Sequence, residues 1–121
     1  MKTIRLTLIA VTILLAGAVV VGAHAFIERA DPRVGSTVHT SPALVRLWFT
    51  EKLEPAFSSV QVLNEAGQRV DKGDAAVDPS APKQLRISLS SLSPGTYKVV
   101  WRVLSVDTHV TEGNFTFRVV P

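Results

Sequence analysis

The 121-residue sequence contains no cysteine, and its single methionine is the first residue. Without cysteine the chain forms no disulfide and no thiolate metal site, which excludes the blue-copper type of electron carrier. Without an internal methionine a soft thioether site for Cu(I) is disfavoured. A folded domain must therefore rely on hydrophobic packing, and a metal site must use nitrogen and oxygen ligands.

Charge is almost absent from the first 23 positions, where Lys2 and Arg5 are followed by an apolar run at residues 6–21 and two small residues. A basic start, an apolar stretch of this length and small residues before a cleavage point are typical of a signal peptide. We expect residues 1–23 to be a signal peptide, cleaved before His24. The mature protein would be one periplasmic domain of residues 24–121.

Two other fates of the N-terminus remain open. The triplet at residues 23–25 is itself an Ala-x-Ala cleavage site, and cutting there would leave Phe26 first and remove His24. Residues 6–27 also form a stretch of 22 positions without a charged side chain, long enough to cross a bilayer as an uncleaved anchor.

The charge balance of the mature chain gives no sign of a polyanionic partner. Loss of Lys2 and Arg5 reduces 13 basic residues to 11, against 10 acidic residues, so the net charge falls to +1. We see no cluster of lysine and arginine interleaved with aromatic residues, as a groove for single-stranded nucleic acid requires. We therefore expect no nucleic-acid partner.

Apolar and polar residues alternate with period two through most of the mature chain, and turn residues separate the alternating runs. This pattern is typical of short antiparallel strands with one buried face. About seven strands in fewer than 100 residues predict an all-β fold, a two-sheet sandwich with Greek-key connections. The expected strands cover residues 25–30, 44–50, 59–63, 68–70 (weak), 85–89, 96–106 and 112–120, with polar loops at 35–42 and 71–83.

A carboxylate and an imidazole follow the longest predicted strand, in the triplet Asp107-Thr108-His109. Residues two apart in an extended chain project to the same side, so we expect Asp107 and His109 to face one another. By itself such a triplet is more often a solvated turn, or a histidine oriented by the aspartate, than a metal site.

His24 strengthens the metal hypothesis, because cleavage before it gives one residue two nitrogen donors, the α-amino group and the imidazole. Together with Asp107 and His109 it offers three nitrogens and one oxygen. Nitrogen and oxygen donors in a tetragonal arrangement suit Cu(II), which heads the divalent affinity series. The sequence therefore predicts a site for one Cu(II) ion, with zinc as the second choice.

Two further side chains need an assignment. Glu51 follows a predicted strand, where it is either a solvated carboxylate or an outer or axial metal ligand. His39 has no carboxylate or second histidine near it in the sequence. We include Glu51 among the candidate ligands and interpret His39 as a solvated loop residue.

Along nearly the whole mature chain the sequence resembles the CopC-type periplasmic copper-resistance proteins. Each matching segment is short, and their combination carries the resemblance. The segments are His24-Ala25 behind a signal peptide, Phe49-Thr50-Glu51, Pro94-Gly95-Thr96-Tyr97-Lys98-Val99, Trp101-Arg102, Ser105-Val106-Asp107-Thr108-His109, and residues 113–117.

This resemblance implies a seven-stranded Ig-like or cupredoxin-like sandwich that holds Cu(II) through the N-terminal histidine and the Asp and His of the D-x-H motif. Those residues are His24, Asp107 and His109 here, with Glu51 near the copper. Some family members carry a methionine-rich loop for Cu(I), whereas residues 71–83 contain no methionine or histidine, which indicates a Cu(II)-only variant. The resemblance also implies a CopD-type inner-membrane partner.

Three classes of function fit these patterns unequally. We predict a monomeric copper carrier or buffer for copper resistance or homeostasis, and not an enzyme. A copper-dependent oxygenase could also use an N-terminal histidine, but the sequence shows no extended aromatic platform for a polysaccharide. A purely structural Ig-like module would share the strand pattern, since fold does not fix function.

Overall fold

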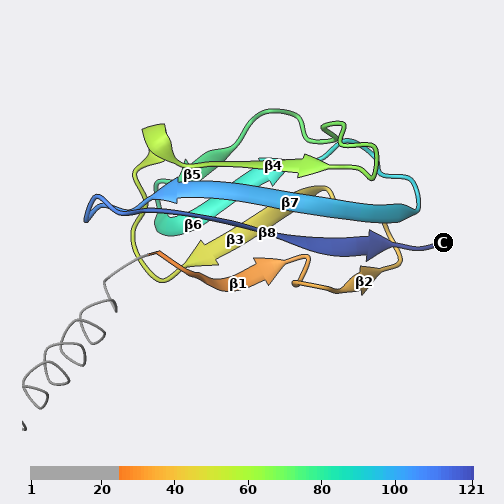
Figure 1. Ribbon diagram of the computed structural model, residues 1–121, viewed down its shortest axis with the longest axis horizontal. Helices are drawn as coiled ribbons and strands as arrows, with labels where there is room; N and C mark the ends of the chain where they lie inside the picture. Colours follow the sequence, from red (N-terminus) through yellow and green to blue (C-terminus); the bar gives the residue numbers. More distant parts are fainter. Residues whose placement is uncertain (1–24) are drawn as a thin grey trace, which may run out of the picture.

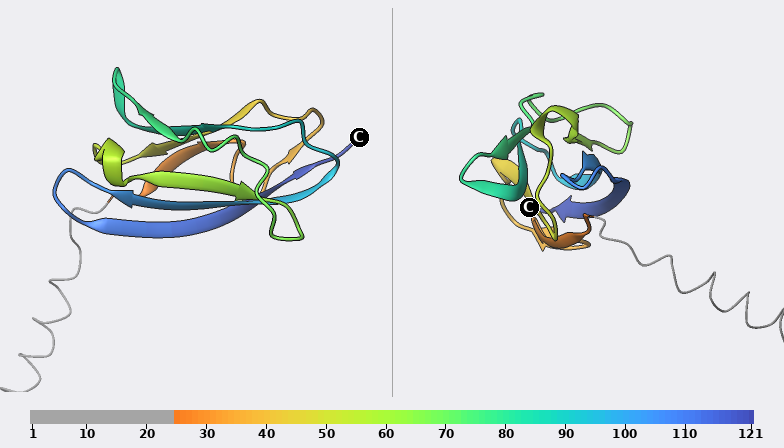
Figure 2. Two further views of the ribbon diagram at one scale, coloured as in Figure 1. Left: turned by 90° about the horizontal axis from the view of Figure 1, so that it is seen from above. Right: turned by 90° about the vertical axis from the view of Figure 1, so that its left-hand side faces the viewer.

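The computed structural model describes residues 25–121, which fold into two four-stranded sheets packed face to face (Figures 1 and 2). One sheet has the order β1-β3-β6-β5 and the other β2-β8-β7-β4, and every neighbouring pair is antiparallel except β2 and β8. The strands are β1 (Ile27–Asp31), β2 (Thr37–Val38), β3 (Leu44–Phe49), β4 (Ser59–Leu63), β5 (Ala76–Asp78), β6 (Ala81–Ser88), β7 (Gly95–Leu104) and β8 (Val110–Val119), with one 3-10 turn, η1 (Pro55–Phe57).

Alternate residues of each long strand point inward and are almost completely buried, as period-two patterning requires. The two sheets meet where the rings of Phe49 on β3 and Trp101 on β7 pack edge to face, with centroids 5.3 Å apart. Gly113 of β8 lies opposite Trp101, and a Cβ there would come within 2.6 Å of the indole. The core strands contribute Val45, Leu47, Phe49, Val60, Val62, Leu85, Ile87, Tyr97, Val99, Trp101, Val103, Phe115, Phe117 and Val119.

The predicted all-β sandwich is confirmed, but two of the predicted loops were wrong. The predicted loop at residues 35–42 contains β2, whose two residues pair with β8 and are too few to show a period in the sequence. The predicted loop at 71–83 contains β5 and the start of β6, joined by a turn in which the Asp78 carboxylate accepts a hydrogen bond from the Ser80 amide at 2.9 Å.

The weak strand expected at residues 68–70 forms only an isolated bridge between Arg69 and Leu63. With β2 and β5 added and this strand absent, residues 25–121 form eight strands in place of the predicted seven. In the part of the chain that the structure describes, no helix has the length and apolar character needed to cross a membrane.

The β7–β8 hairpin and the beginning of the described chain lie at the same end of the sandwich (Figure 1). The hairpin contains ten residue pairs, from Gly95 with Val119 to Leu104 with Val110, and turns through residues 105–109. Beside it, the Thr111 hydroxyl donates a hydrogen bond of 2.7 Å to the carbonyl oxygen of Ala25. This end of the molecule brings the D-x-H triplet close to the N-terminal strand.

Candidate metal centre

The triplet Asp107-Thr108-His109 lies in a tight turn and not in an extended segment. The Ser105 amide donates to the His109 carbonyl at 3.0 Å, and the Thr108 amide donates to the Ser105 carbonyl at 2.9 Å. Thr108 has a φ of 70°, in the left-handed region that β-branched residues rarely adopt. We expected the two side chains to face one another along an extended chain. They do face one another, but the backbone here is a turn, so the reason given was wrong.

Within the turn, the side chains of Asp107 and His109 face each other. Asp107 Oδ2 lies 3.3 Å from His109 Nδ1, and the side chains are 33% and 50% exposed, so solvent reaches both. The other carboxylate oxygen, Oδ1, accepts a hydrogen bond from the Ser105 hydroxyl. A carboxylate that contacts Nδ1 orients the imidazole.

The same contacts keep the Asp107 carboxylate ionised. The hydrogen bond from Ser105 is the main cause that lowers the pKa of Asp107; desolvation opposes it, and the hydrogen bonds and charge of His109 each add a smaller lowering. A metal ion therefore does not need to displace a proton from this carboxylate at neutral pH.

His24, the predicted third ligand, lies outside the described residues, but its neighbour is firmly placed. Ala25 is fully buried, and its carbonyl accepts the Thr111 hydrogen bond on β8, two residues beyond His109. Next to it, Phe26 exchanges hydrogen bonds with Thr50, whose hydroxyl lies 3.0 Å from the Phe26 amide and whose own amide donates to the Phe26 carbonyl at 2.9 Å. Residue 25 is therefore anchored on the hairpin, next to the turn.

Glu51 belongs to the loop after β3, which lies against the turn. The carbonyl of the next residue, Lys52, accepts a hydrogen bond from the Val106 amide at 3.0 Å. Nevertheless, within residues 25–121 no group of three or more histidine, aspartate, glutamate or cysteine side chains is arranged to hold a metal. The described chain thus brings together Asp107 and His109 but does not add Glu51 to them.

His39 follows β2, which pairs with β8 near Val119, whereas the turn adjoins Val110 at the other end of β8. It is exposed to solvent there. Its interpretation as a residue outside the site agrees with this position.

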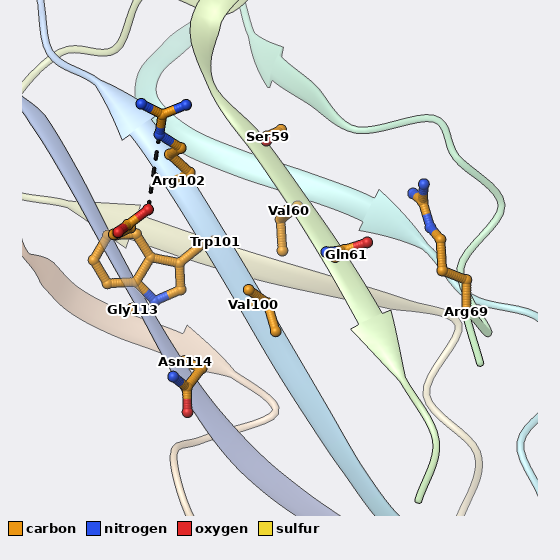
Figure 3. A pocket seen from close by; sticks show the side chains of 10 residues that line it. Ser59, Val60, Gln61, Arg69, Val100, Trp101, Arg102, Gly113 and Asn114 are labelled. Carbon is orange, nitrogen blue, oxygen red and sulfur yellow. Dashed lines mark ion pairs between the residues drawn. The ribbon is translucent and has the colours of Figure 1, made fainter. Parts of the chain in front are cut away.

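A shallow groove of about 570 Å³ lies elsewhere, on the outer face of the β4, β7 and β8 sheet (Figure 3). Val100 lies along it between Gln61 and Asn114, and Arg102 pairs with Glu112 at its edge, with Nε and Oε2 3.8 Å apart. No histidine lines this groove in the described structure. We therefore place the candidate metal centre at the hairpin turn and not in the groove.

Sequence reasoning missed Ser105 and Thr111 as contributors to this centre. Both continue inward-facing series, Ser105 after Trp101 and Val103 on β7, and Thr111 before Phe115 on β8. A hydroxyl residue at an inward position, next to candidate ligands, is the signal that could have identified them, because buried hydroxyls need a specific partner.

Comparisons with known proteins give a consistent result. The family described as the CopC domain matches residues 27–120. The crystal structure of CopC from Methylosinus trichosporium OB3b has a TM-score of 0.76 and 39% sequence identity over 81% of this chain and 95% of that chain.

Two copper-resistance proteins are also similar. The crystal structure of PcoC, a methionine-rich copper resistance protein from Escherichia coli, has a TM-score of 0.67 and 34% identity over 81% of this chain and 100% of that chain. Copper resistance protein C of Xanthomonas campestris pv. juglandis is 35% identical over 121 residues, which cover 92% of this chain and 94% of that protein.

Proposed function

The chain belongs to the CopC domain family, and on that premise we propose that it is a periplasmic copper-resistance protein that binds one Cu(II) ion through His24, Asp107 and His109. Cleavage of residues 1–23 would expose the α-amino group of His24. That residue would then supply two nitrogens, and the hairpin turn would supply the imidazole of His109 and the carboxylate of Asp107.

The observation that carries this proposal is the hydrogen bond from Thr111 to Ala25. It fixes the residue after His24 on the strand that begins next to His109, while the Asp107–His109 contact orients the imidazole. The described residues offer a two-residue half-site, and a donor at position 24 is suitably connected to complete it. Without such a donor, two half-exposed side chains would make a weak site.

The choice of Cu(II) follows from the donor set. Amine, imidazole and carboxylate donors are harder than the thioethers that Cu(I) prefers. PcoC is described as methionine-rich, whereas this chain has one methionine, at position 1. A carrier with these donors would hold oxidised copper without turning over a substrate. Glu51 would be an outer ligand, which is supported by the hydrogen bond that holds the next residue, Lys52, to Val106 of the turn.

Copper bound at one end of the sandwich would be accessible to a receiving protein. A CopD-type inner-membrane protein is the partner that the family resemblance favours, and a monomer with its hairpin end exposed would suffice for the transfer.

Copper affinity measured by competition with a chromophoric chelator tests the ligand set. In processed protein whose intact mass starts at His24, His109→Ala, Asp107→Ala and His24→Ala should each weaken Cu(II) binding by more than about 100-fold, since loss of even an outer-shell partner costs 10- to 100-fold. His39→Ala is the matched control and should bind like the wild type. Equal losses for His39→Ala and His109→Ala would contradict the assignment.

A further inference from the structure

Large apolar side chains are exposed mainly at the end of the sandwich that holds the β7–β8 turn. Of the five large hydrophobic residues that are exposed in residues 25–121, four lie at this end, with 49% to 70% of their surface exposed. These four residues are Phe26, Phe57, Val106 and Val110. Single apolar side chains on a surface need no explanation, but apolar side chains that gather in one place and are bordered by polar residues mark an interaction site.

Two segments of the chain form this end, and backbone hydrogen bonds join them. The Glu54 amide donates to the Leu104 carbonyl at 2.8 Å, and the Val106 amide donates to the Lys52 carbonyl at 3.0 Å. η1 and the hairpin turn therefore lie at the same end of the sandwich, near the beginning of the described chain (Figures 1 and 2). We name this surface the hairpin-end face, formed by residues 25–26, 50–57 and 102–112.

The hairpin-end face is negatively charged, although residues 24–121 as a whole are slightly positive. It carries four acidic residues against two basic ones, a net charge of −2 with histidine neutral. The acidic residues are Glu51, Glu54, Asp107 and Glu112, and the basic ones are Lys52 and Arg102. The rest of residues 24–121 has nine basic and six acidic residues, a net charge of +3. The exposed apolar side chains thus lie among carboxylates.

This charge decides between the three kinds of surface that could cover the apolar side chains. Anionic lipid headgroups would repel a face with a net charge of −2. A second copy in a symmetric contact would bring the same negative face against it. A protein surface that is apolar at its centre and has lysine and arginine at its rim matches both the apolar side chains and the carboxylates.

We propose that the hairpin-end face docks a protein partner whose contact surface is apolar and bordered by lysine and arginine. Asp107 and His109 lie in the turn between Val106 and Val110, so a partner that docks here would cover the metal centre. We therefore assign this docking to the copper-receiving membrane protein, and in that assignment the inference rests on the proposed function. The docking itself depends on the apolar side chains and on the charge, and not on a bound metal.

Photo-cross-linking to right-side-out membrane vesicles of the bacterium that produces the protein tests this proposal. The mature protein carries benzoylphenylalanine in place of Phe57, or in place of Val34 as the matched control. Val34 is 61% exposed and precedes Gly35, whose amide donates to the Thr116 carbonyl, away from the hairpin-end face. We expect an adduct with one inner-membrane protein from position 57 and none from position 34. Equal yields at the two positions, or no adduct at either, would overturn the proposal.

A change of charge tests whether the captured protein has the basic rim that the proposal requires. In the chain with the cross-linker at position 57, Glu54→Lys should lower the adduct yield about 10-fold, because it removes part of the attraction that steers a basic partner. Asp31→Lys makes the same change of charge at an exposed position on β1 and should leave the yield unchanged. Backbone amide spectra should show that both variants are folded. Equal losses in both variants would contradict docking at this face.

Two further arms identify the other occupants. Liposomes made from the extracted lipids contain no protein, so equal sedimentation of the chain with liposomes and with vesicles would overturn the proposal in favour of a lipid surface. An adduct of twice the chain mass, formed from position 57 in buffer alone, would assign the face to a second copy of this chain.

Repeating the cross-linking on metal-free protein separates this inference from the proposed function. If the mature protein binds no copper but position 57 still gives the charge-dependent adduct, the copper-carrier function fails and the docking face stands. If the protein binds one copper ion but position 57 gives no adduct, the proposed function stands and the docking face is wrong.

Discussion

At the scale of single residues, Thr108 has a strained backbone conformation in the candidate site. A left-handed backbone costs a residue with a Cβ about 1–2 kcal/mol, and Thr108 adopts it with a φ of 70°. Its hydroxyl offsets part of this cost by donating a hydrogen bond of 2.6 Å to the Asp107 carbonyl. Strained residues of this kind concentrate where the surrounding structure imposes a functional geometry.

Replacing Thr108 separates the strain from the hydrogen bond. Thr108→Gly removes both, so its free energy of unfolding should stay within about 1 kcal/mol of the wild type or rise. Thr108→Val keeps the strain and loses the bond, and it should be destabilised by about 1 kcal/mol. Urea unfolding of the two variants checks this, and equal destabilisation of both would contradict the strain argument.

Only part of the site could be predicted at this scale. The pairing of Asp107 with His109 was expected from their spacing, but the reason given for it was wrong, because a turn replaces the assumed extended chain. Threonine rarely adopts a positive φ, so nothing in the sequence indicates one at Thr108. The role of Ser105 depends on three contacts across the turn, and it becomes visible only when the backbone is folded.

At the scale of elements, the Asp71 side chain connects the irregular segment after β4 to the sheet by hydrogen bonds. Its side chain is fully buried and pairs with Arg69, with Oδ1 and Nη2 2.7 Å apart. Its carboxylate also accepts the amides of Val62 at 2.8 Å and Gly73 at 2.9 Å. Burial is the largest single influence and raises the pKa of Asp71, but the hydrogen bonds from Arg69, Val62 and Gly73 together outweigh it and lower the pKa.

This lowered pKa makes a prediction about acid stability. Because Asp71 binds its proton less readily in the folded than in the unfolded chain, its contribution is present above the unfolded pKa of about 3.9 and is lost as the pH falls through the lower folded value. Asp71→Asn should lower the free energy of unfolding at neutral pH by about 1–3 kcal/mol and flatten its decline toward pH about 3.

Denaturant midpoints measured across this pH range test the prediction. Asp31→Asn, at an exposed position on β1, is the control and should change the midpoints little. If Asp71→Asn declined with pH as steeply as the wild type, another carboxylate would have to account for the acid sensitivity.

The elements themselves were predictable in proportion to their length. The strands with several inward positions, such as β3, β7 and β8, were located to within a few residues from alternation alone. β2 and β5 have two and three residues, and they exist through pairing with β8 and β6. Such short strands carry no period, and the aspartates near β5 stabilise turns that resemble a solvated loop in the sequence.

At the scale of the whole molecule, the sandwich joins the chain's beginning to its last hairpin. Ala25 is held by Thr111, 86 positions later in the sequence, and Phe26 by Thr50, 24 positions later. A site that combines the first mature residue with the turn at 105–109 therefore needs the complete fold. Period-two patterning could predict the sandwich, but it could not predict which ends of its strands would meet.

Membership of the CopC domain family supports a role in copper resistance, while the proposed site depends on the predicted cleavage of the N-terminus. Cleavage before His24 would create the amine donor next to Ala25. Cleavage before Phe26 would remove both His24 and the carbonyl that Thr111 holds.

Native mass spectrometry tests this account most directly, on protein recovered from the periplasm, loaded with Cu(II) and freed of excess metal. We predict a chain that starts at His24 and carries one copper ion, and a His109→Ala variant that starts at the same residue and carries none. A chain that starts at Phe26 and still retains one copper, or one that starts at His24 and retains none, would contradict the proposed centre.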